Sequence, residues 1–167
     1  MSVRPHSAPS GGNGAKAVSR GSLAALTVRR ARPGDAVAIR ALLEQLGYTP
    51  DPRLANETIT QVVRHPEAAV FVAVEGLQVV GFLAMSHRPQ IRLGGLLASI
   101  DELVVSSQRR AQGIGSTLLE TALAHARSLH CRRVELHTNK ARESYKRQFY
   151  VQRGFKEVGS ALLRIDF

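Results

Sequence analysis

The residues best suited to chemistry are the glycines Gly113 and Gly115, in the segment from Arg110 to Ser116 (RAQGIGS). The segment is expected between a strand and a helix, where the helix offers unpaired N–H groups and the positive end of its dipole. Glycines there let a phosphate reach the backbone because no Cβ is in the way. The pattern therefore predicts a phosphate-binding loop, although glycines that only form a tight turn would leave the same pattern.

Two common nucleotide-binding loops are excluded by the residues around these glycines. A dinucleotide-binding loop needs a third glycine at position 118, which is Leu118. A P-loop needs Gly-Lys followed by Ser or Thr, and the segment has no such sequence. A phosphate bound here would therefore belong to another class of ligand.

Two adjacent acids, Asp101 and Glu102, interrupt the apolar segment Leu97 to Val105 (LASIDELVV), which is predicted to be a strand. A carboxylate can act as the base that removes a proton from an amine. On a regular strand neighbouring side chains point to opposite faces, so only one of these acids can serve a given site. The alternative is that they are surface carboxylates paired with nearby arginines.

The elements that position these residues follow from hydrophobic periodicity and from Gly and Pro positions. Strands are predicted at Leu26–Ala31, Ala69–Val74, Val79–Ser86, Leu97–Val105, Arg132–His137 and from about Glu157 to Ile165. Helices are predicted from the cap Asp35 to Leu46, over Arg53–Arg64 and Ile114–Ala126, and near Ala141–Tyr150, with loops at 47–52 and 87–95. This order predicts a mixed α/β sheet in a single domain, residues 26–167, after a flexible extension over residues 1–25.

Composition limits the class of protein. The chain has 167 residues, 44% of them hydrophobic, which suits one domain with a full core. Its single cysteine, Cys131, excludes an internal disulfide, and the Cys and His residues lack zinc-ligand spacing, so no metal is expected. The sequence has neither an apolar membrane span nor the apolar core of a secretory signal, so we expect a soluble, cytoplasmic protein.

The formal net charge is +10, from 23 Lys and Arg against 13 Asp and Glu, and it favours an anionic partner. Residues 1–25 contribute Arg4, Lys16 and Arg20 without an acid. From position 101 to the end there are 12 basic and 7 acidic residues, a surplus of 5. The anion is therefore expected in the part of the chain that carries the glycine loop.

Two motifs together resemble a known family. Arg110-x-x-Gly113-x-Gly115, preceded by an apolar strand, resembles the acetyl-CoA loop of the GNAT superfamily of N-acetyltransferases. Downstream, Phe149-Tyr150-x-x-x-Gly154-Phe155 is similar to a second motif of that family, and the element order from Leu26 onward matches as well. The resemblance implies the GNAT fold, a mixed, mostly antiparallel sheet flanked by helices, with a splayed strand pair at the cofactor site.

The resemblance also implies which residues bind acetyl-CoA, the co-substrate. The backbone of the strand before the loop would hold the pantetheine arm, and the loop amides together with Arg110 would hold the pyrophosphate. The residues concerned are Leu103, Val104, Val105, Arg110, Ala111, Gln112, Gly113, Ile114, Gly115 and Ser116. Asn139 is added as a CoA contact, because the positions seven and four before Tyr150, often Asn or Arg and Ala in relatives, are Glu143 and Lys146 here. Arg109 is left as either a phosphate contact or a surface charge.

The implied reaction is direct transfer of acetyl to a primary amine in a ternary complex, without a metal. Glu102 would act on the amine, often through water, and Tyr150 would protonate the CoA thiolate. A backbone N–H near Leu103 would stabilise the oxyanion. The alternatives are a non-catalytic GNAT domain that senses acyl-CoA and a nucleic-acid-binding module, against which stand only 5% aromatic residues and no recognised signature.

The acceptor is expected between residues 47–53 and 87–95, because loops at these places line the amine site in the family. They hold Asp51 but also Arg53, Arg88 and Arg92. This composition favours a small amine or an amino acid with its own carboxylate, or a protein N-terminus, over a polycation. No membrane partner is expected, nucleic acid is not favoured, and a homodimer is possible.

Overall fold

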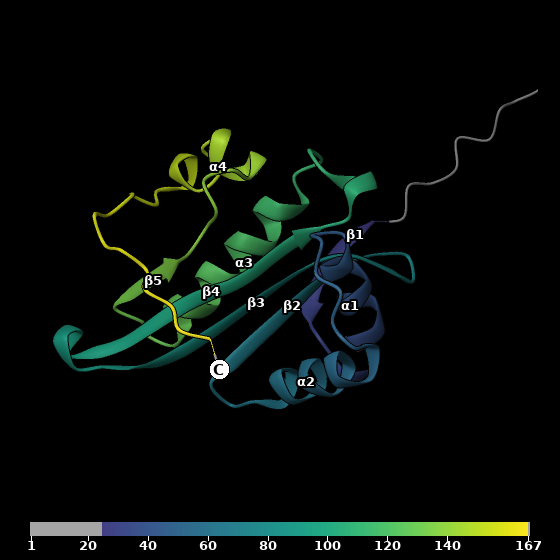
Figure 1. Cartoon of the computed structure of the whole chain (residues 1–167), viewed down its shortest axis with the longest axis horizontal. Coiled ribbons are helices and arrows are strands. Elements are labelled where there is room, and N and C mark those ends of the chain that lie inside the picture. The colour runs from purple at the N-terminus through teal and green to yellow at the C-terminus, as the bar shows by residue number, and fades with distance from the viewer. Residues whose placement is uncertain (1–24, 167) are drawn as a thin grey trace, which may run out of the picture.

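The computed structural model describes residues 25–166, which form a five-stranded sheet with the strands in chain order (Figure 1). The strands are β1 (Leu26–Arg30), β2 (Ala68–Glu75), β3 (Gln78–Gln90), β4 (Gly95–Val105) and β5 (Arg133–Leu136). The first four pair antiparallel, and β5 runs parallel to β4. The mixed, mostly antiparallel sheet is thereby confirmed. The expected flexible extension, apart from Ala25, lies outside the described residues.

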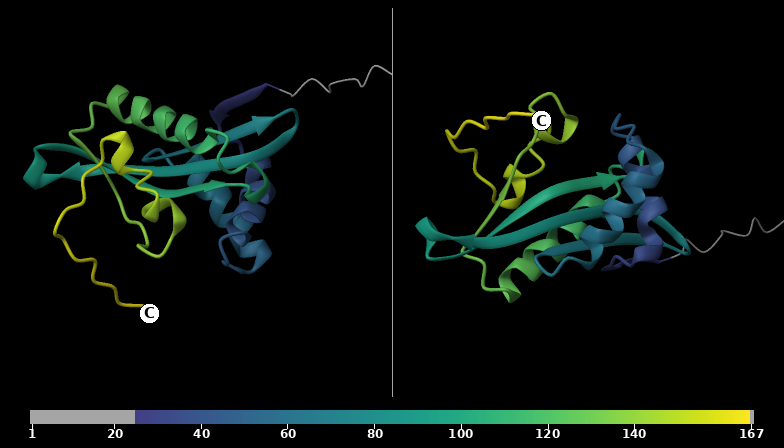
Figure 2. Two further views of the ribbon diagram at one scale, coloured as in Figure 1. Left: turned by 90° about the horizontal axis from the view of Figure 1, so that it is seen from above. Right: turned by 60° about the horizontal axis from the view of Figure 1, so that its bottom comes forward.

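Helices cover both faces of the sheet. They are α1 (Ala36–Glu44), α2 (Pro52–Arg64), α3 (Ile114–Ser128) and the short α4 (Glu143–Lys146). Figure 2 shows α3 on one face and α1 with α2 on the other. The apolar side of α3, including Leu118 and Ala122, packs on Leu83 and Ala98, whereas Ile39 of α1 packs in a second core. The helices predicted at the places of α1, α2 and α3 are confirmed, although α1 ends at Glu44 rather than at Leu46.

The loop predicted over residues 87–95 is wrong, because β3 continues to Gln90 and only a short turn, Ile91–Gly94, separates it from β4. Arg88 pairs with Leu97 across the hairpin and Pro89 with Leu96. Proline fits there because β2 has already ended, its last partner in β3 being Ser86, so the missing N–H breaks no bond to β2. Gly94, with φ of 58°, closes the turn.

The strand predicted over Glu157–Ile165 is also wrong, since no strand follows β5 within residues 25–166. A strand needs a neighbour for its backbone N–H and C=O groups, and this segment pairs with none. Leu162 and Leu163 are both exposed and interrupt the alternation. The segment is attached instead through Glu157, which accepts hydrogen bonds from Lys140 and Tyr145.

The feature that positions the candidate site is the divergence of β4 from β5. The parallel pairing covers only Leu97–Ile100 of β4 and ends at Leu136 of β5. β4 itself continues to Val105, so residues 101–105, here called the open edge, have no neighbour on the β5 side. This is the splayed pair that the GNAT fold implies. Among residues 25–166, no helix is both long and apolar enough to cross a membrane.

One carboxylate fastens β1 to α1 and gives a testable pH dependence. Asp35 accepts two hydrogen bonds from the Arg29 guanidinium, at 2.8 and 2.9 Å, and one from the Arg32 N–H at 2.7 Å. The bonds from Arg29 hold the pKa of Asp35 below its usual range, against the opposing effect of burial. A carboxyl with a lowered folded-state pKa stabilises the protein above its unfolded pKa and loses that effect as the pH falls.

We therefore expect Asp35→Asn to lower the free energy of unfolding by about 2 kcal/mol at pH 7. The difference from the unsubstituted chain should shrink below about pH 4, where carboxyls begin to protonate. Urea unfolding at both pH values measures it. Asp51→Asn is the matched control, because asparagine can still accept the Leu54 N–H bond that caps α2. An equal loss of stability at pH 7 and pH 3 would contradict the role of the charge.

Candidate functional site

The open edge presents backbone groups rather than side chains. The Ser106 N–H bonds to the Val80 carbonyl at 2.9 Å, so Ser106 faces β3. In an antiparallel ladder the backbone N–H and C=O groups of successive residues point alternately to the two neighbouring strands. Those of Val104 therefore also face β3, while those of Leu103 and Val105 face the side from which β5 has diverged. The side chain of Val104 is buried in the core beneath α1. Three strand residues were expected at the cofactor. The backbone groups of Leu103 and Val105 face the open side, whereas those of Val104 do not.

A β-bulge decides where Glu102 points. In the register Ala84 faces Glu102 and Met85 faces Ile100, which leaves Asp101 as an extra residue. Ile100 and Leu103 both contact the core beneath α3. Glu102 lies opposite Ala84, whose side chain belongs to the core beneath α1, so its carboxylate is on the α1 face. The assumption of a regular strand, by which Asp101 and Glu102 take opposite faces, does not hold at this point.

The Glu102 carboxyl is suited to take up a proton. Its side chain is exposed to solvent. Even so, the protein around it raises its pKa through burial, and the negative charge of Asp101 raises it further. We find no hydrogen bond to this carboxyl from residues 25–166, so its oxygens are available to a ligand or to water.

Tyr150 comes to the same place from the far end of the chain. After α4, a positive φ of 52° at Gln148 turns the backbone, and Phe149 and Phe155 hold the Tyr150 ring edge-to-face at 5.0 and 5.9 Å. The half-buried ring packs on the core that includes Leu103 of the open edge. Burial raises the pKa of its hydroxyl, and the charge of Arg142 acts in the opposite direction. The phenol therefore keeps its proton at neutral pH.

The glycine loop offers unpaired N–H groups at the start of α3. Gly113 caps the helix with φ of 84°, and Ala111 has φ of 62°, unusual for a residue with a side chain. Amides in such left-handed turns form concave anion sites. Within the described chain we find no acceptor for the N–H groups of residues 111–115. The Ser116 N–H, by contrast, already bonds to the Gly113 carbonyl at 2.9 Å.

The arginines beside the loop have different roles. Arg110 folds back, and its Nε donates to the Val105 carbonyl at 3.3 Å, on the open edge. Arg109 turns away and pairs with Glu75 of β2 at 2.8 Å. Of the two possibilities left open for Arg109, the structure supports an ion pair within the fold.

Sequence reasoning missed Arg153. Its guanidinium stacks over the Phe149 ring at 4.0 Å and donates to the Phe149 carbonyl at 2.7 Å and to the Ser116 Oγ. It therefore lies at the first turn of α3, where the helix dipole favours anions over cations. No carboxylate within residues 25–166 pairs with it. The 37 positions between Ser116 and Arg153 explain why no local signal in the sequence could reveal the contact.

Two further side chains meet beside Tyr150. The Arg142 guanidinium donates to the Tyr48 hydroxyl at 3.4 Å, which joins the segment before α4 to the segment between α1 and α2. Asn139, the expected CoA contact, is exposed, and its side-chain oxygen accepts the Ala141 N–H at 2.8 Å. Its side-chain oxygen therefore shapes a local turn, and its contact with CoA stays a prediction.

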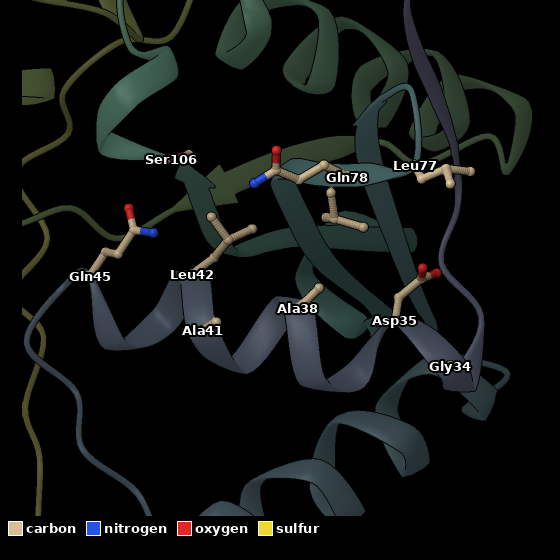
Figure 3. A pocket seen from close by; sticks show the side chains of 10 residues that line it. Gly34, Asp35, Ala38, Ala41, Leu42, Gln45, Leu77, Gln78 and Ser106 are labelled. Atoms are coloured by element: carbon tan, nitrogen blue, oxygen red, sulfur yellow. The ribbon is translucent and has the colours of Figure 1, made fainter.

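Two hollows in the surface lie away from these residues. One, of about 380 Å³, lies between α1 and the β2–β3 turn and is lined by Ala38, Gln45 and Gln78, among others (Figure 3). The Asp35 at its edge is already bonded to Arg29. Another, of about 580 Å³, is lined by Arg127, His130, Cys131 and Arg132. Neither hollow is lined by Glu102 or Tyr150.

Comparison with known proteins agrees with this geometry. Residues 36–155 match the model of the acetyltransferase (GNAT) family. The chain belongs to this family. It is 29% identical over 132 residues to an aminoalkylphosphonate N-acetyltransferase of Salmonella typhimurium, a match that covers 78% of the chain and 84% of that protein. It is also 35% identical over 98 residues to N-acetyltransferase 8F1 of Mus musculus, covering 59% of the chain but only 44% of that protein.

Among solved structures, a protein from Bacillus halodurans C-125 described as a transcriptional regulator superposes with a TM-score of 0.76 and 27% identity. The match covers 86% of this chain and all of that one. The family ordinarily uses acetyl-CoA as co-substrate. Within the part of the chain that the structure describes, no cluster of His, Cys, Asp and Glu could hold a metal ion.

The two loop glycines should respond oppositely to alanine. Gly113→Ala should cost about 1–2 kcal/mol of unfolding free energy, because its left-handed φ is unfavourable for alanine. Gly115→Ala should be neutral or stabilise by about 0.5 kcal/mol, since its Cβ would meet Phe149 and Val105 at ordinary distances of 3.5 and 3.6 Å on a helix. Thermal unfolding compares the pair. Equal destabilisation by the two substitutions would show that the space for a Cβ, and not the backbone conformation, decides which residues the loop tolerates.

Proposed function

We propose that this GNAT protein is an N-acetyltransferase that moves the acetyl group of acetyl-CoA directly to a primary amine in a ternary complex. The observation that carries the proposal is the open edge, where the outward backbone groups of Leu103 and Val105 have no strand partner and Glu102 precedes them on β4. Tyr150 supports it, because its ring packs against the same hydrophobic core as Leu103. The unpaired amides of residues 111–115 lie at the C-terminal side of the same edge. A base, an acid, an oxyanion donor and an anion site therefore lie along one stretch of β4 and its neighbours.

The residues present suit the parts of CoA. The extended backbone of Leu103 and Val105 can pair with the amide groups of a pantetheine arm, as a neighbouring strand would. The N–H groups of residues 111–115 and the dipole of α3 suit a pyrophosphate. Arg110 and Arg153 flank this loop, and guanidinium groups make strong charge-assisted bonds to phosphate.

Each step of the transfer has a candidate residue. Glu102, whose pKa is raised, accepts a proton from the ammonium of the acceptor, directly or through water. The Leu103 N–H donates to the acetyl oxygen as negative charge develops there during C–N bond formation. Tyr150 donates its hydroxyl proton to the sulfur as the C–S bond breaks, and the second proton that the nitrogen loses on becoming an amide restores the Tyr150 hydroxyl through water. Glu102 then releases its proton to solvent. The products are the acetylated amine and CoA with a free thiol.

Two alternatives remain distinguishable by experiment. A GNAT domain that only senses acyl-CoA would bind CoA but release no thiol with any amine. A nucleic-acid-binding protein would show DNA or RNA affinity that falls steeply with salt. The cytoplasmic location and a homodimer stay predictions.

Removing the proposed base or acid should affect turnover rather than cofactor affinity. Glu102→Gln and Tyr150→Phe should each lower kcat by about 10²- to 10⁴-fold, the range of general acid and base catalysis. Acetyl-CoA binding should change little, since neither group faces the phosphate loop. In the unsubstituted chain kcat/KM should rise with pH above the usual carboxyl range, because only ionised Glu102 accepts a proton. Thiol release against pH measures both effects.

Matched controls come from the same segments. Tyr145→Phe removes only a bond to Glu157, and Glu143→Gln only an exposed pair with Lys146. Both should retain turnover within about 2-fold, since exposed pairs contribute little. Unchanged turnover in Glu102→Gln and Tyr150→Phe would sink the assigned roles.

Arg153 should contribute to affinity for the phosphates. Arg153→Met should weaken CoA binding by about 10-fold, the loss expected for one charge-assisted contact. Binding of pantetheine, which lacks the phosphates, should not change. Calorimetric titration with both ligands tests this, with the exposed Arg147→Met as a charge-matched control. Equal weakening of CoA and pantetheine would mean that Arg153 only supports the packing of Phe149.

A further inference from the structure

The pair Tyr48–Arg142 is left unexplained by the proposed reaction. Its members are 94 positions apart in sequence, and the hydrogen bond at 3.4 Å between them connects the segment after α1 to the start of α4. Both side chains are exposed. Because Tyr48 follows α1, the contact places the Arg142 guanidinium toward the α1 face of the sheet, the face to which Glu102 points.

Arg142 has no carboxylate partner within residues 25–166, although acids are close to it in sequence. The adjacent Glu143 pairs with Lys146 at 3.0 Å. Glu157, on the segment that packs behind α4, is taken by Lys140 and Tyr145. The acids around Arg142 are therefore committed to other groups, and its positive charge remains available to a ligand.

The charges at the site are arranged in two poles. Asp101 and Glu102 form the negative pole, on the open edge of β4. Arg142 forms the positive pole. It is close enough to Tyr150 for its charge to act on the hydroxyl, and the Tyr150 ring packs against the same core as Leu103 of the open edge. A molecule with an ammonium group at one end and an anionic group at the other would match both poles.

We propose that Arg142, assisted by the Tyr48 hydroxyl, binds an anionic group of the acceptor, so that the acceptor is a small primary amine that also carries a carboxylate or a phosphonate. This inference rests on the proposed acetyltransferase function and names its substrate class. A guanidinium is well matched to both anions because its N–H groups bind two oxygens at once. A polyamine would bring positive charge against Arg142 and gain no partner there.

Two of the three arginines expected at the acceptor from sequence alone, Arg53 and Arg92, do not take this role. Arg53 is paired with Glu57 of its own helix at 3.0 Å. The turn that carries Arg92 is at the far end of the β3–β4 hairpin (Figure 1). β4 begins after this turn at Gly95, and Glu102 follows 102 − 95 = 7 residues later, roughly 23 Å along the strand at about 3.3 Å per residue. The sequence and the structure both favour an acceptor with an anionic group, but in the structure this preference rests on Arg142.

The test compares acceptors that differ only in charge. Thiol release from acetyl-CoA is measured with glycine and glycinamide, with 2-aminoethylphosphonate and its neutral diethyl ester, and with spermidine. The unsubstituted chain should favour at least one anionic member over its neutral partner by about 10- to 100-fold in kcat/KM, as expected for a charge-assisted contact. Whether the carboxylate or the phosphonate pair shows the preference identifies the anion.

Variants then assign the preference to Arg142. Arg142→Gln should bring the ratio of kcat/KM between charged and neutral acceptors to about one, and using the ratio cancels any effect on Tyr150 that all acceptors share. Arg142→Lys should keep part of the ratio, and Tyr48→Phe should reduce it slightly. Arg64→Gln, which removes one exposed charge from α2, should leave the ratio unchanged. A ratio near one in the unsubstituted chain, a preference for spermidine, or a ratio that survives Arg142→Gln would overturn the inference.

A binding measurement separates this inference from the proposed function. NMR titration of 2-aminoethylphosphonate and of glycine into the CoA complex should show affinity that Arg142→Gln loses and Arg64→Gln keeps. If no amine releases thiol, the acetyltransferase proposal fails, and the titration alone decides whether Arg142 binds the anion. If neutral amines are acetylated but neither anion binds, the proposed function stands and the inference fails.

Discussion

The candidate site depends on what happens to β4 at Ile100. There β4 gains an extra residue, Asp101, relative to β3 and at the same place loses β5 as a partner. The bulge brings Glu102 to the α1 face, and the loss of β5 leaves the backbone of Leu103 and Val105 unpaired on one side. A regular ladder would instead have closed the sheet and buried the groups that the reaction needs. The proposed transfer therefore depends on this interruption of pairing as well as on the Glu102 and Tyr150 side chains.

Most of the fold could be predicted because its signals are local. The apolar spacing of α3 and the Gly and Pro positions around α1 and α2 are visible within a dozen residues. The errors concern pairing between segments. The length of the β3–β4 hairpin depends on Pro89 lying where β2 has already ended, and the absent last strand depends on a missing neighbour, although Val158 to Ile165 has apolar residues typical of a strand. Neither condition can be recognised from the residues of the segment itself, because each depends on a distant strand.

The site shows the same division. The glycine loop and the Phe149-Tyr150 motif could be found because their spacing is short and specific. The roles of the arginines could not be predicted, because the long side chain lets the guanidinium reach several partners and only the folded structure shows which one it contacts. Arg109 and Arg110 are adjacent, yet one ends at Glu75 and the other at the Val105 carbonyl. The bulge was equally invisible, since no residue type between Ile100 and Glu102 requires it.

The bond from Arg110 to the Val105 carbonyl has a consequence for solution behaviour. An unpaired strand inside a sheet resembles an exposed sheet edge, which other chains can extend into aggregates. Natural proteins protect such edges with charged side chains, and a guanidinium held on the Val105 carbonyl does this at the end of the open edge. Because the Val105 carbonyl already accepts this bond, it is not available to a strand of another molecule, so the contact opposes intermolecular strand pairing at this end of β4.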